Sequence, residues 1–284
     1  MPVTFSIITP SFNQLHYLKR CVASIRDQAA SGLVIRHLVV DGASTDGTPE
    51  WLRAEGIAHI SEPDGGMYDA LNKGLDHFFP EPCTLNPAHY FAWLNADEQY
   101  LPGTIEYIAA YSQRHPSVDI VCGDALIVDP AGELLTYWKS LPLRRMYLDI
   151  GTLYNLTCGL FFRASIFAAG ARFDARYQAI ADLVMIRQLL AKGVESACVR
   201  RYVAAYTHAT SNISNQPKAK EEYRQFCAHQ GPVQRTVARV MRAGERFLRA
   251  GRKQAFPLEY QLYTDAATDR TAFTAGPVPA RWPA

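Results

Sequence analysis

The sequence predicts an α/β fold in which helices flank both faces of a mainly parallel central sheet. Over the first hundred residues, short apolar runs rich in β-branched residues alternate with stretches of helical periodicity. Such alternation is typical of right-handed crossovers between parallel strands. The 284 residues allow one large α/β domain or one domain with an appendage, and the hydrophobic fraction of 48% allows a sizeable core.

The first two strand–helix units follow from the periodicity. Residues 3–9 form a β-rich run, after which Asn13 stands where it could cap a helix. That helix would bury one apolar face, made of Leu15, Leu18, Val22 and Ile25. A second apolar run covers 33–40, and Thr48-Pro49 then begins a helix with proline at the first helical position.

Two further strands complete the first half. A short strand near 59–61 leads into a Gly-rich turn and a helix, and a run over 90–94 ends at Asn95-Ala96-Asp97. The carboxyl ends of parallel strands meet at one edge of the sheet, where ligands bind in such folds. Three aspartates follow strand ends and are expected at this edge: Asp41, Asp64 and Asp97.

The pattern changes after residue 118. Antiparallel strands are expected over 120–122, 126–128 and 134–138, and helices near 164–169, 180–192 and 217–229. The last thirty residues are poor in regular pattern. We therefore expect a main domain over 1–215 and a helical or irregular extension over 216–284.

Composition and charge exclude several classes of protein. The net charge of +2 is too small to indicate a nucleic-acid partner. The six cysteines lack zinc-ligand spacing and are scattered, which favours a reducing compartment over a disulfide framework. No signal peptide and no apolar run of roughly 18 residues is present. We expect a cytoplasmic protein, soluble or peripheral on the inner face of the plasma membrane.

Oxygen-bearing side chains follow the fourth strand. If the ligand at this edge is a nucleotide diphosphate, carboxylates alone would repel its negative charges. A bound Mn²⁺ or Mg²⁺ would remove this repulsion, because both ions prefer oxygen ligands and can bind the carboxylates and the phosphates together. Asp97 is the first candidate ligand, with Asn95 and Glu98 beside it. The alternative is that these residues cap the next helix. Asp41 could accept hydrogen bonds from a base or ribose, or could serve only an Asp-Gly turn.

Four motifs stand in order along the first hundred residues. They are SIITPSFN at 6–13, VDGASTDGT at 40–48, SEPDGGMYDALNKG at 61–74 and WLNADE at 93–98. In this order and at these intervals they resemble the inverting family 2 glycosyltransferases, which have the GT-A fold. The Glu-Pro-Asp-Gly-Gly form is similar to members that build bacterial exopolysaccharide and lipopolysaccharide.

The resemblance implies that residues 1–115 bind a nucleotide sugar and residues 116–215 bind the acceptor. The implied donor-binding residues are Thr9, Pro10, Asp41, Asp64, Asn72, Lys73 and Asn95. Asn95-Ala96-Asp97 stands where the family has its Asp-x-Asp motif, with Asn95 in place of the usual first aspartate. The implied ligands of Mn²⁺ or Mg²⁺ are Asp97, Glu98 and His208. The Gly-Gly-x-Ser segment common near this histidine is missing, and a lone histidine is more often structural.

An inverting transfer needs a general base that deprotonates the acceptor hydroxyl. The family places this base in an acidic motif that opens a helix, and the match here makes Asp182 the candidate. The second acidic residue of the motif is absent, and the distance to Arg187 differs by one residue. The alternative is an aspartate that only favours the helix dipole. Cys158-Gly159 could line the acceptor side or lie in a buried strand.

Residues 231–254 form a basic segment. They contain seven basic residues and one acid, Glu245, and the valines recur at helical spacing. Such a cationic amphipathic helix could lie on an anionic membrane surface. The alternative is a helix packed on the main domain with its arginines in solvent.

The sequence thus predicts a metal-dependent inverting glycosyltransferase that acts in bacterial surface polysaccharide synthesis. The donor would be a nucleotide-diphosphate sugar (UDP favoured, GDP or dTDP open) and the acceptor a glycan or lipid-linked molecule. One alternative is a nucleotidyltransferase, which usually needs an early Gly-rich basic loop that residues 10–13 do not provide. The other is a degenerate domain that binds a sugar nucleotide or a partner without turnover.

Overall fold

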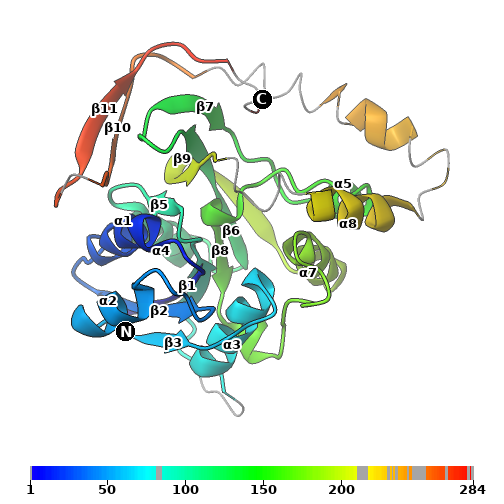
Figure 1. Cartoon of the computed structure of the whole chain (residues 1–284). Helices are drawn as coiled ribbons and strands as arrows, with labels where there is room; N and C mark the ends of the chain where they lie inside the picture. Colours follow the sequence, from blue (N-terminus) through cyan, green and yellow to red (C-terminus); the bar gives the residue numbers. More distant parts are fainter. Residues whose placement is uncertain are drawn as a thin grey trace.

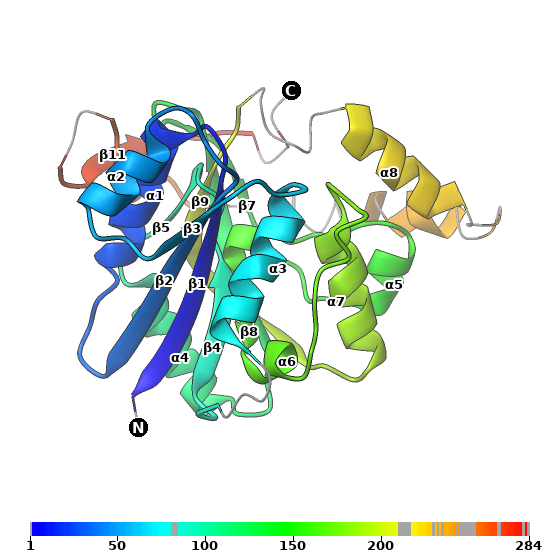
Figure 2. The same ribbon diagram turned by 60° about the horizontal axis from the view of Figure 1, so that its bottom comes forward.

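The computed structural model describes residues 2–80, 85–209, 217–228, 231, 233, 236–241, 243–244, 254–265, 268–279 and 282. One sheet of nine strands runs through this part of the chain, in the order β3-β2-β1-β4-β8-β6-β9-β5, with β7 paired to β6. Helices cover both faces of the sheet (Figures 1 and 2). The α/β architecture with a mainly parallel sheet is therefore confirmed.

The first half of the sheet is entirely parallel. Its strands are β3 (His59–Ser61), β2 (Leu33–Asp41), β1 (Val3–Ser11) and β4 (His89–Trp93). The crossover helices are α1 (Leu15–Arg26), α2 (Thr48–Ala54) and α3 (Met67–Phe78). These elements match the ones that the periodicity predicts, because continuous apolar runs are typical of parallel strands buried on both faces.

Two hydrophobic cores lie on opposite faces of this sheet. Along β1, Ile7 belongs to the core that includes residues of α1 and α4 (Thr104–Arg114), whereas Ile8 belongs to the core that includes residues of α3. A Cβ added at Gly74 of α3 would lie 2.6 Å from the Ile8 side chain. The glycine lets α3 lie against the strand, which fixes where the first turn of the helix stands.

The second half of the sheet mixes directions. The short strand β8 (Leu160–Arg163) lies antiparallel between β4 and β6 (Ile120–Val128), and β6 pairs in parallel with β9 (Ser196–Thr207). The antiparallel partners β7 (Leu134–Trp138) and β5 (Glu98–Tyr100) pair with β6 and β9 respectively. Three short elements, α5 (Arg145–Asp149), η1 (Thr157–Gly159) and α6 (Ser165–Ala168), and the longer helix α7 (Ala181–Ala191) complete this half.

The expectation of separate strands over 120–122 and 126–128 is wrong, because both belong to β6. Asp124 interrupts the apolar run in the sequence, which suggested a break. In the structure its carboxylate is buried but lies 3.3 Å from Lys139 Nζ and accepts the backbone N–H of Ser140 at 2.8 Å. The strand continues through this charge with only a register shift.

The expectation that Asn13 caps the first helix is also wrong. Asn13 has a left-handed φ of 51°, and its side-chain oxygen accepts the backbone N–H of Thr45 at 2.8 Å. Asp46 instead accepts the first N–H of α1, from Leu15, at 2.9 Å, and also that of Thr48 at 3.2 Å. One aspartate thus holds the starts of α1 and α2 together at the carboxyl edge of the sheet.

The C-terminal region contains helix α8 (Pro217–Ala228), as expected, and a hairpin that the pattern did not indicate. Strands β10 (Leu258–Leu262) and β11 (Thr271–Ala275) form an antiparallel pair, and Tyr260 packs in a core with Leu126 of β6. Most of the basic segment 231–254 lies outside the described residues, and of its basic side chains only Arg239 lies within them. The boundaries 1–215 and 216–284 stay a prediction.

Candidate active site

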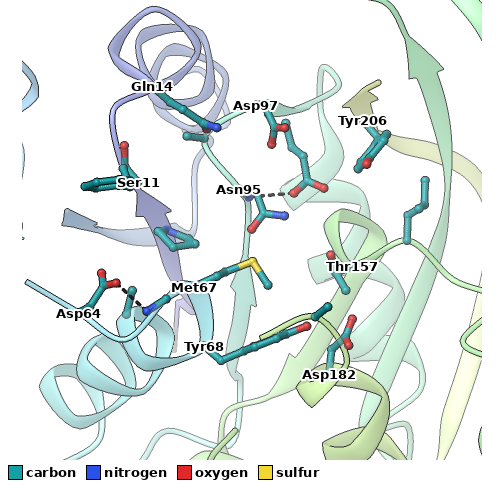
Figure 3. Close-up of a pocket in the computed structure, with 18 residues that line it drawn as sticks. Ser11, Gln14, Asp64, Met67, Tyr68, Asn95, Asp97, Thr157, Asp182 and Tyr206 are labelled. Atoms are coloured by element: carbon teal, nitrogen blue, oxygen red, sulfur yellow. Dashed lines mark hydrogen bonds between the residues drawn. The ribbon is translucent and has the colours of Figure 1, made fainter. Parts of the chain in front are cut away.

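A cavity of about 440 Å³ opens at the carboxyl edge of the sheet and is lined by both halves of the domain. The first half contributes Pro10, Ser11, Phe12, Gln14, Asp64, Gly66, Met67, Tyr68, Ala70, Asn95, Ala96, Asp97 and Glu98. The second half contributes Leu156, Thr157, Ala179, Asp182 and Tyr206. Figure 3 shows the Tyr68 ring directed toward Asp182, with Asp64, Asp97 and Tyr206 placed around the same cavity.

The end of β1 forms one wall. Pro10 lines the cavity, and the Phe12 side chain beside it is 61% exposed. Thr9 is fully buried instead, and its hydroxyl is 2.9 Å from His37 Nε2. Burial lowers the pKa of His37 to about 3. The Thr9 side chain therefore belongs to the interior, and the wall begins at Pro10.

Asp41 ends β2 but is not among the residues that line the cavity. Its buried carboxylate accepts the Ser61 hydroxyl at 2.6 Å, the Ser44 hydroxyl, and the Ser44 backbone N–H at 3.2 Å. These bonds hold the turn at Ala43, which has a left-handed φ of 62°. In this geometry Asp41 shapes the loop behind the cavity.

Asp64 lines the cavity at the start of α3. Its carboxylate accepts the backbone N–H of Gly66 at 2.8 Å, and burial raises its pKa. A Cβ added at Gly42 would lie 2.8 Å from Asp64 Oδ2. The Asp41-Gly42 turn therefore supports the Asp64 carboxylate from behind, because glycine leaves room for it.

Asn72 and Lys73 follow on α3 and are not among the cavity-lining residues. The Asn72 side chain makes two hydrogen bonds with the backbone of Phe173. Asn72 Nδ2 donates to the Phe173 carbonyl at 2.8 Å, and the Phe173 N–H donates to Asn72 Oδ1 at 2.9 Å. Lys73 Nζ lies 2.8 Å from a Glu62 carboxylate oxygen and donates to the Pro63 carbonyl at 2.7 Å. Both residues hold loops that border the cavity.

Asn95, Asp97 and Glu98 form the wall between β4 and β5. Helix α4 begins at Thr104, so the alternative that these residues cap a helix is wrong. Glu98 is 1% exposed, accepts the Asn95 backbone N–H at 2.8 Å and hydrogen-bonds with the Cys158 side chain. Burial, and next the charge of Asp97, raise the pKa of Glu98 to about 8.

The wall formed by Asn95, Asp97 and Glu98 fits a hard cation that takes some of its ligands from the protein and the others from a substrate. No described residue bonds to the buried Asn95 Oδ1, and the Asp97 side chain lines the same cavity. No group of three or more His, Cys, Asp or Glu side chains able to hold a metal occurs among the described residues. A Mg²⁺-type ion fits a site with few protein oxygens because it keeps waters and binds substrate phosphates.

His208 lies just beyond β9. Its backbone N–H donates to the Val128 carbonyl at 2.8 Å, and its ring meets the Trp282 ring edge-on at a centroid distance of 5.9 Å. The histidine is not among the residues that line the cavity, although Tyr206 two positions earlier is.

Asp182 stands in the first turn of α7, on the wall opposite Asp64 (Figure 3). Its carboxylate accepts the Leu183 backbone N–H at 2.7 Å, and the Tyr68 hydroxyl stabilises its charged form. Burial outweighs these contacts and raises its pKa to about 6. Arg187 is 2.5 Å from the Asp149 carboxylate of α5, so the downstream arginine anchors α7 to its neighbour.

Several residues that line the cavity were not predicted from the sequence. Tyr68 and Met67 lie inside the recognised motif at 61–74, so their place at a helix start next to a strand end could have indicated them. Tyr206 carries no local signal, because the pairing of β9 with β5 brings it to the cavity, and Thr157 arrives on the short helix η1. Cys158 is buried behind the cavity, against Glu98.

Residues 6–175 match the family described as Glycosyl transferase family 2. The chain belongs to this family. Over 77 residues it is 48% identical to an uncharacterized glycosyltransferase of Mycobacterium tuberculosis, covering 26% of this chain and 29% of that protein. Over 191 residues it is 27% identical to a PGL/p-HBAD biosynthesis glycosyltransferase of Mycobacterium bovis, covering 63% and 66%. The matches thus span less than two thirds of these relatives' own length.

Solved structures show the GT-A fold for this family 2 chain. Residues 1–349 of Staphylococcus aureus TarS, in complex with UDP-GlcNAc, superpose with a TM-score of 0.60 at 15% identity, covering 78% of this chain and 64% of that TarS fragment. The mannosyltransferase PcManGT of Pyrobaculum calidifontis, in complex with GDP-Man and Mn²⁺, superposes with a TM-score of 0.58 at 16% identity, covering 89% and 76%. The predicted GT-A class is confirmed.

Proposed function

We propose that this chain is a metal-dependent inverting glycosyltransferase that transfers a sugar from a nucleoside diphosphate sugar to an acceptor hydroxyl. The observation that carries the proposal is the single cavity that joins the Asn95–Asp97 wall to Asp182. Oxygen groups suited to a diphosphate-bound cation and a carboxylate suited to proton removal therefore line one cavity.

The donor base would bind at the end of β1. Phe12 offers an exposed aromatic ring and Pro10 an apolar surface at the cavity wall, and stacking on an aromatic ring suits any nucleobase. UDP is the favoured nucleotide, with GDP and dTDP as the alternatives, since TarS and PcManGT bind a UDP sugar and a GDP sugar respectively. Asp64 would face the donor from the start of α3.

Asp97 and the Asn95 side-chain oxygen would hold Mn²⁺ or Mg²⁺, with Glu98 supporting Asn95 from behind. The ion would stabilise the charge of the leaving diphosphate. His208 remains a candidate for a further ligand contributed from beyond β9. The protein's part is to fix the diphosphate so that the anomeric carbon faces Asp182.

Transfer would proceed as one in-line displacement. The Asp182 carboxylate takes the proton of the acceptor hydroxyl, and the oxygen forms a bond to the anomeric carbon. The bond from that carbon to the diphosphate oxygen breaks, and the diphosphate leaves with its electron pair. Because attack and departure occur on opposite sides of the carbon, the product has the inverted configuration.

The acceptor side suits a glycan or a lipid-linked molecule. Leu156, Ala179 and Tyr206 give this part of the cavity an apolar and aromatic lining. Relatives at 27% identity carry a name in PGL/p-HBAD biosynthesis, and bacterial surface polysaccharide synthesis is the setting that the sequence motifs favour.

Membrane contact would present such an acceptor. Val233, Val237 and Val240 are 76%, 43% and 66% exposed, at helical spacing within the strongly basic segment 231–254. An apolar row within a basic segment is typical of helices that lie on anionic lipid. Among the described residues, no helix has the length and hydropathy of a membrane span.

The proposal is tested by thermal unfolding of the full chain with UDP, GDP, CDP or dTDP, each with Mn²⁺ or with EDTA. A ligand at a hundred times its dissociation constant stabilises the native state by about 2.7 kcal/mol. One nucleotide should raise Tm with metal only, and Asp97→Ala should abolish the increase. No increase for any nucleotide, with anionic vesicles present as well, would contradict the donor site and favour a degenerate domain that binds a partner in place of a sugar nucleotide.

A further inference from the structure

Helix α3 carries a tyrosine that faces the candidate base. Tyr68 is 3% exposed and lines the cavity, with its ring directed from α3 toward Asp182 of α7 (Figure 3). Its hydroxyl end points toward the Asp182 carboxylate, and a hydrogen bond donated by Tyr68 is one of the influences that lower the pKa of that carboxyl against the larger effect of burial. These two residues are far apart in the sequence and belong to opposite halves of the domain.

The surroundings hold this pair in place. The Tyr68 ring packs on Phe173 at a centroid distance of 5.4 Å, and Asn72, one turn further along α3, bonds the Phe173 backbone at 2.8 and 2.9 Å. On the other side, the Glu222 carboxylate of α8 accepts the backbone N–H groups of Gln178 and Ala179 at 2.8 and 2.9 Å. The segment before α7 is thus fixed from both α3 and α8.

We propose that Tyr68 is a positioning residue that orients the Asp182 carboxylate toward the acceptor through its hydroxyl. The inference rests on the proposed role of Asp182 as the base. The carboxylate accepts the Leu183 N–H at 2.7 Å, and a second bond donated by the Tyr68 hydroxyl that points toward it would fix its plane and leave its remaining lone pairs directed into the cavity. Rigid placement of a base is worth much of its catalytic effect.

The other charged groups near Tyr68 and Asp182 are held in contacts of their own. Asp149 of α5 is paired with Arg187, and Glu222 of α8 acts electrostatically on Tyr68 while bonded to two N–H groups. Burial raises the pKa of Tyr68 well above its usual value, so its hydroxyl donates throughout the range in which Asp182 titrates.

The test is a comparison of urea unfolding from pH 4 to 8 in four chains: wild type, Asp182→Asn, Tyr68→Phe and the double variant. Each chain with Asp182 is compared with the chain that differs from it only by Asn at this position, and the difference between their free energies of unfolding isolates the titration of Asp182. With Tyr68 present, the midpoint of that titration in the folded state is expected near pH 6. Without the hydroxyl it should rise by about one to two pH units, because a hydrogen bond to the charged form is lost.

Phe173→Leu is the matched control, since it loosens the packing of the Tyr68 ring and keeps the hydroxyl. It should lower stability and leave the midpoint near 6. A midpoint unchanged in Tyr68→Phe, or moved equally by Phe173→Leu, would overturn the inference.

Turnover separates this inference from the proposed function. In the metal-dependent hydrolysis of UDP-glucose and UDP-GlcNAc at pH 6.5, Tyr68→Phe should be slower by roughly tenfold if its midpoint rises as expected. Asp182→Asn at the wild-type rate would remove the base itself, and the positioning role with it. Loss of turnover in Asp182→Asn with a wild-type rate in Tyr68→Phe would overturn only the role of Tyr68.

Discussion

Asn72 binds both the carbonyl and the N–H group of Phe173, at 2.8 and 2.9 Å. A side-chain amide is suited to this because it offers a donor and an acceptor together. The contact joins α3 to the segment that leads toward α7, and so joins the two halves of the domain beneath the cavity. The motif residue Asn72 is thus placed as a connector, and its part in donor binding stays a prediction.

Asn72→Ala should therefore destabilise the fold more than it weakens nucleotide binding. Two hydrogen bonds of ordinary strength are lost, so the free energy of unfolding should fall by about 1–3 kcal/mol. Urea unfolding measures this, and the metal-dependent increase in Tm with UDP should remain. An unchanged stability with loss of that increase would instead place Asn72 in direct contact with the donor.

Asp182→Asn should lose transfer by roughly 10²–10⁴-fold, the usual contribution of a general base. The rate of wild type should rise as the pH increases through about 6, where the carboxyl loses its proton. Nucleotide binding should be retained, because the donor wall lies on the other half. A full rate in Asp182→Asn, measured as release of nucleotide diphosphate, would contradict the assignment.

The same carboxyl makes stability depend on pH with a definite sign. Its folded pKa, about 6, lies above the ordinary 3.8, so the folded state binds the proton more tightly. The free energy of unfolding should decrease as pH rises between these values. Asp182→Asn should remove this slope; a slope that persists unchanged would show that Asp182 titrates normally.

Two histidines, His89 (buried) and His37 (partly buried), should act in the opposite direction. Burial lowers the pKa of His37 to about 3 and that of His89 to about 4, and arginines add to both effects. Their stabilisation is complete above pH 6.5 and is lost as pH falls toward 4. In an Asp182→Asn background, His37→Gln and His89→Gln should each flatten the acid loss seen in urea unfolding. If the free energy of unfolding falls equally steeply with decreasing pH in the presence and absence of these histidines, their protonation does not cause the loss of stability in acid.

Gly42→Ala should weaken donor binding with little cost in stability. The new Cβ would meet Asp64 Oδ2 at 2.8 Å and push that carboxylate toward the cavity. Gly65→Ala is the control, because its Cβ would meet Asp69 only at 3.6 Å, an ordinary contact. Nucleotide titrations of the two variants should differ by at least severalfold in dissociation constant; equal values would separate Asp64 from the donor.

The first half of the site could be predicted because its signals are local. Asp64 and Asp97 each follow a strand end, and strand ends can be read from apolar runs and turn residues. The direction in which such a side chain points is harder to predict from the sequence. Asp41 follows the same rule but turns into the protein, since Ser44 and Ser61 satisfy its carboxylate there.

The second half depends on pairings between distant segments. Tyr206 reaches the cavity because β9 pairs with β5 and β6, and no local pattern specifies those partners. The hairpin β10–β11 was missed for a related reason. Its strands have five residues each, and their alternation becomes meaningful only against the surface of β6 that Tyr260 and Leu262 cover.

That hairpin also has a consequence for biosynthesis. It is bound to the first helix of the chain through Arg20 and Asp265, which are 2.6 Å apart, and through Arg270 and Asp27, which are 2.5 Å apart. Contacts across more than 240 positions form only after residue 270 has left the ribosome. Until β10 and β11 have been synthesised, Leu126 lacks the cover that Tyr260 and Leu262 give it, so this hairpin shields an apolar surface that earlier segments of the nascent protein leave exposed.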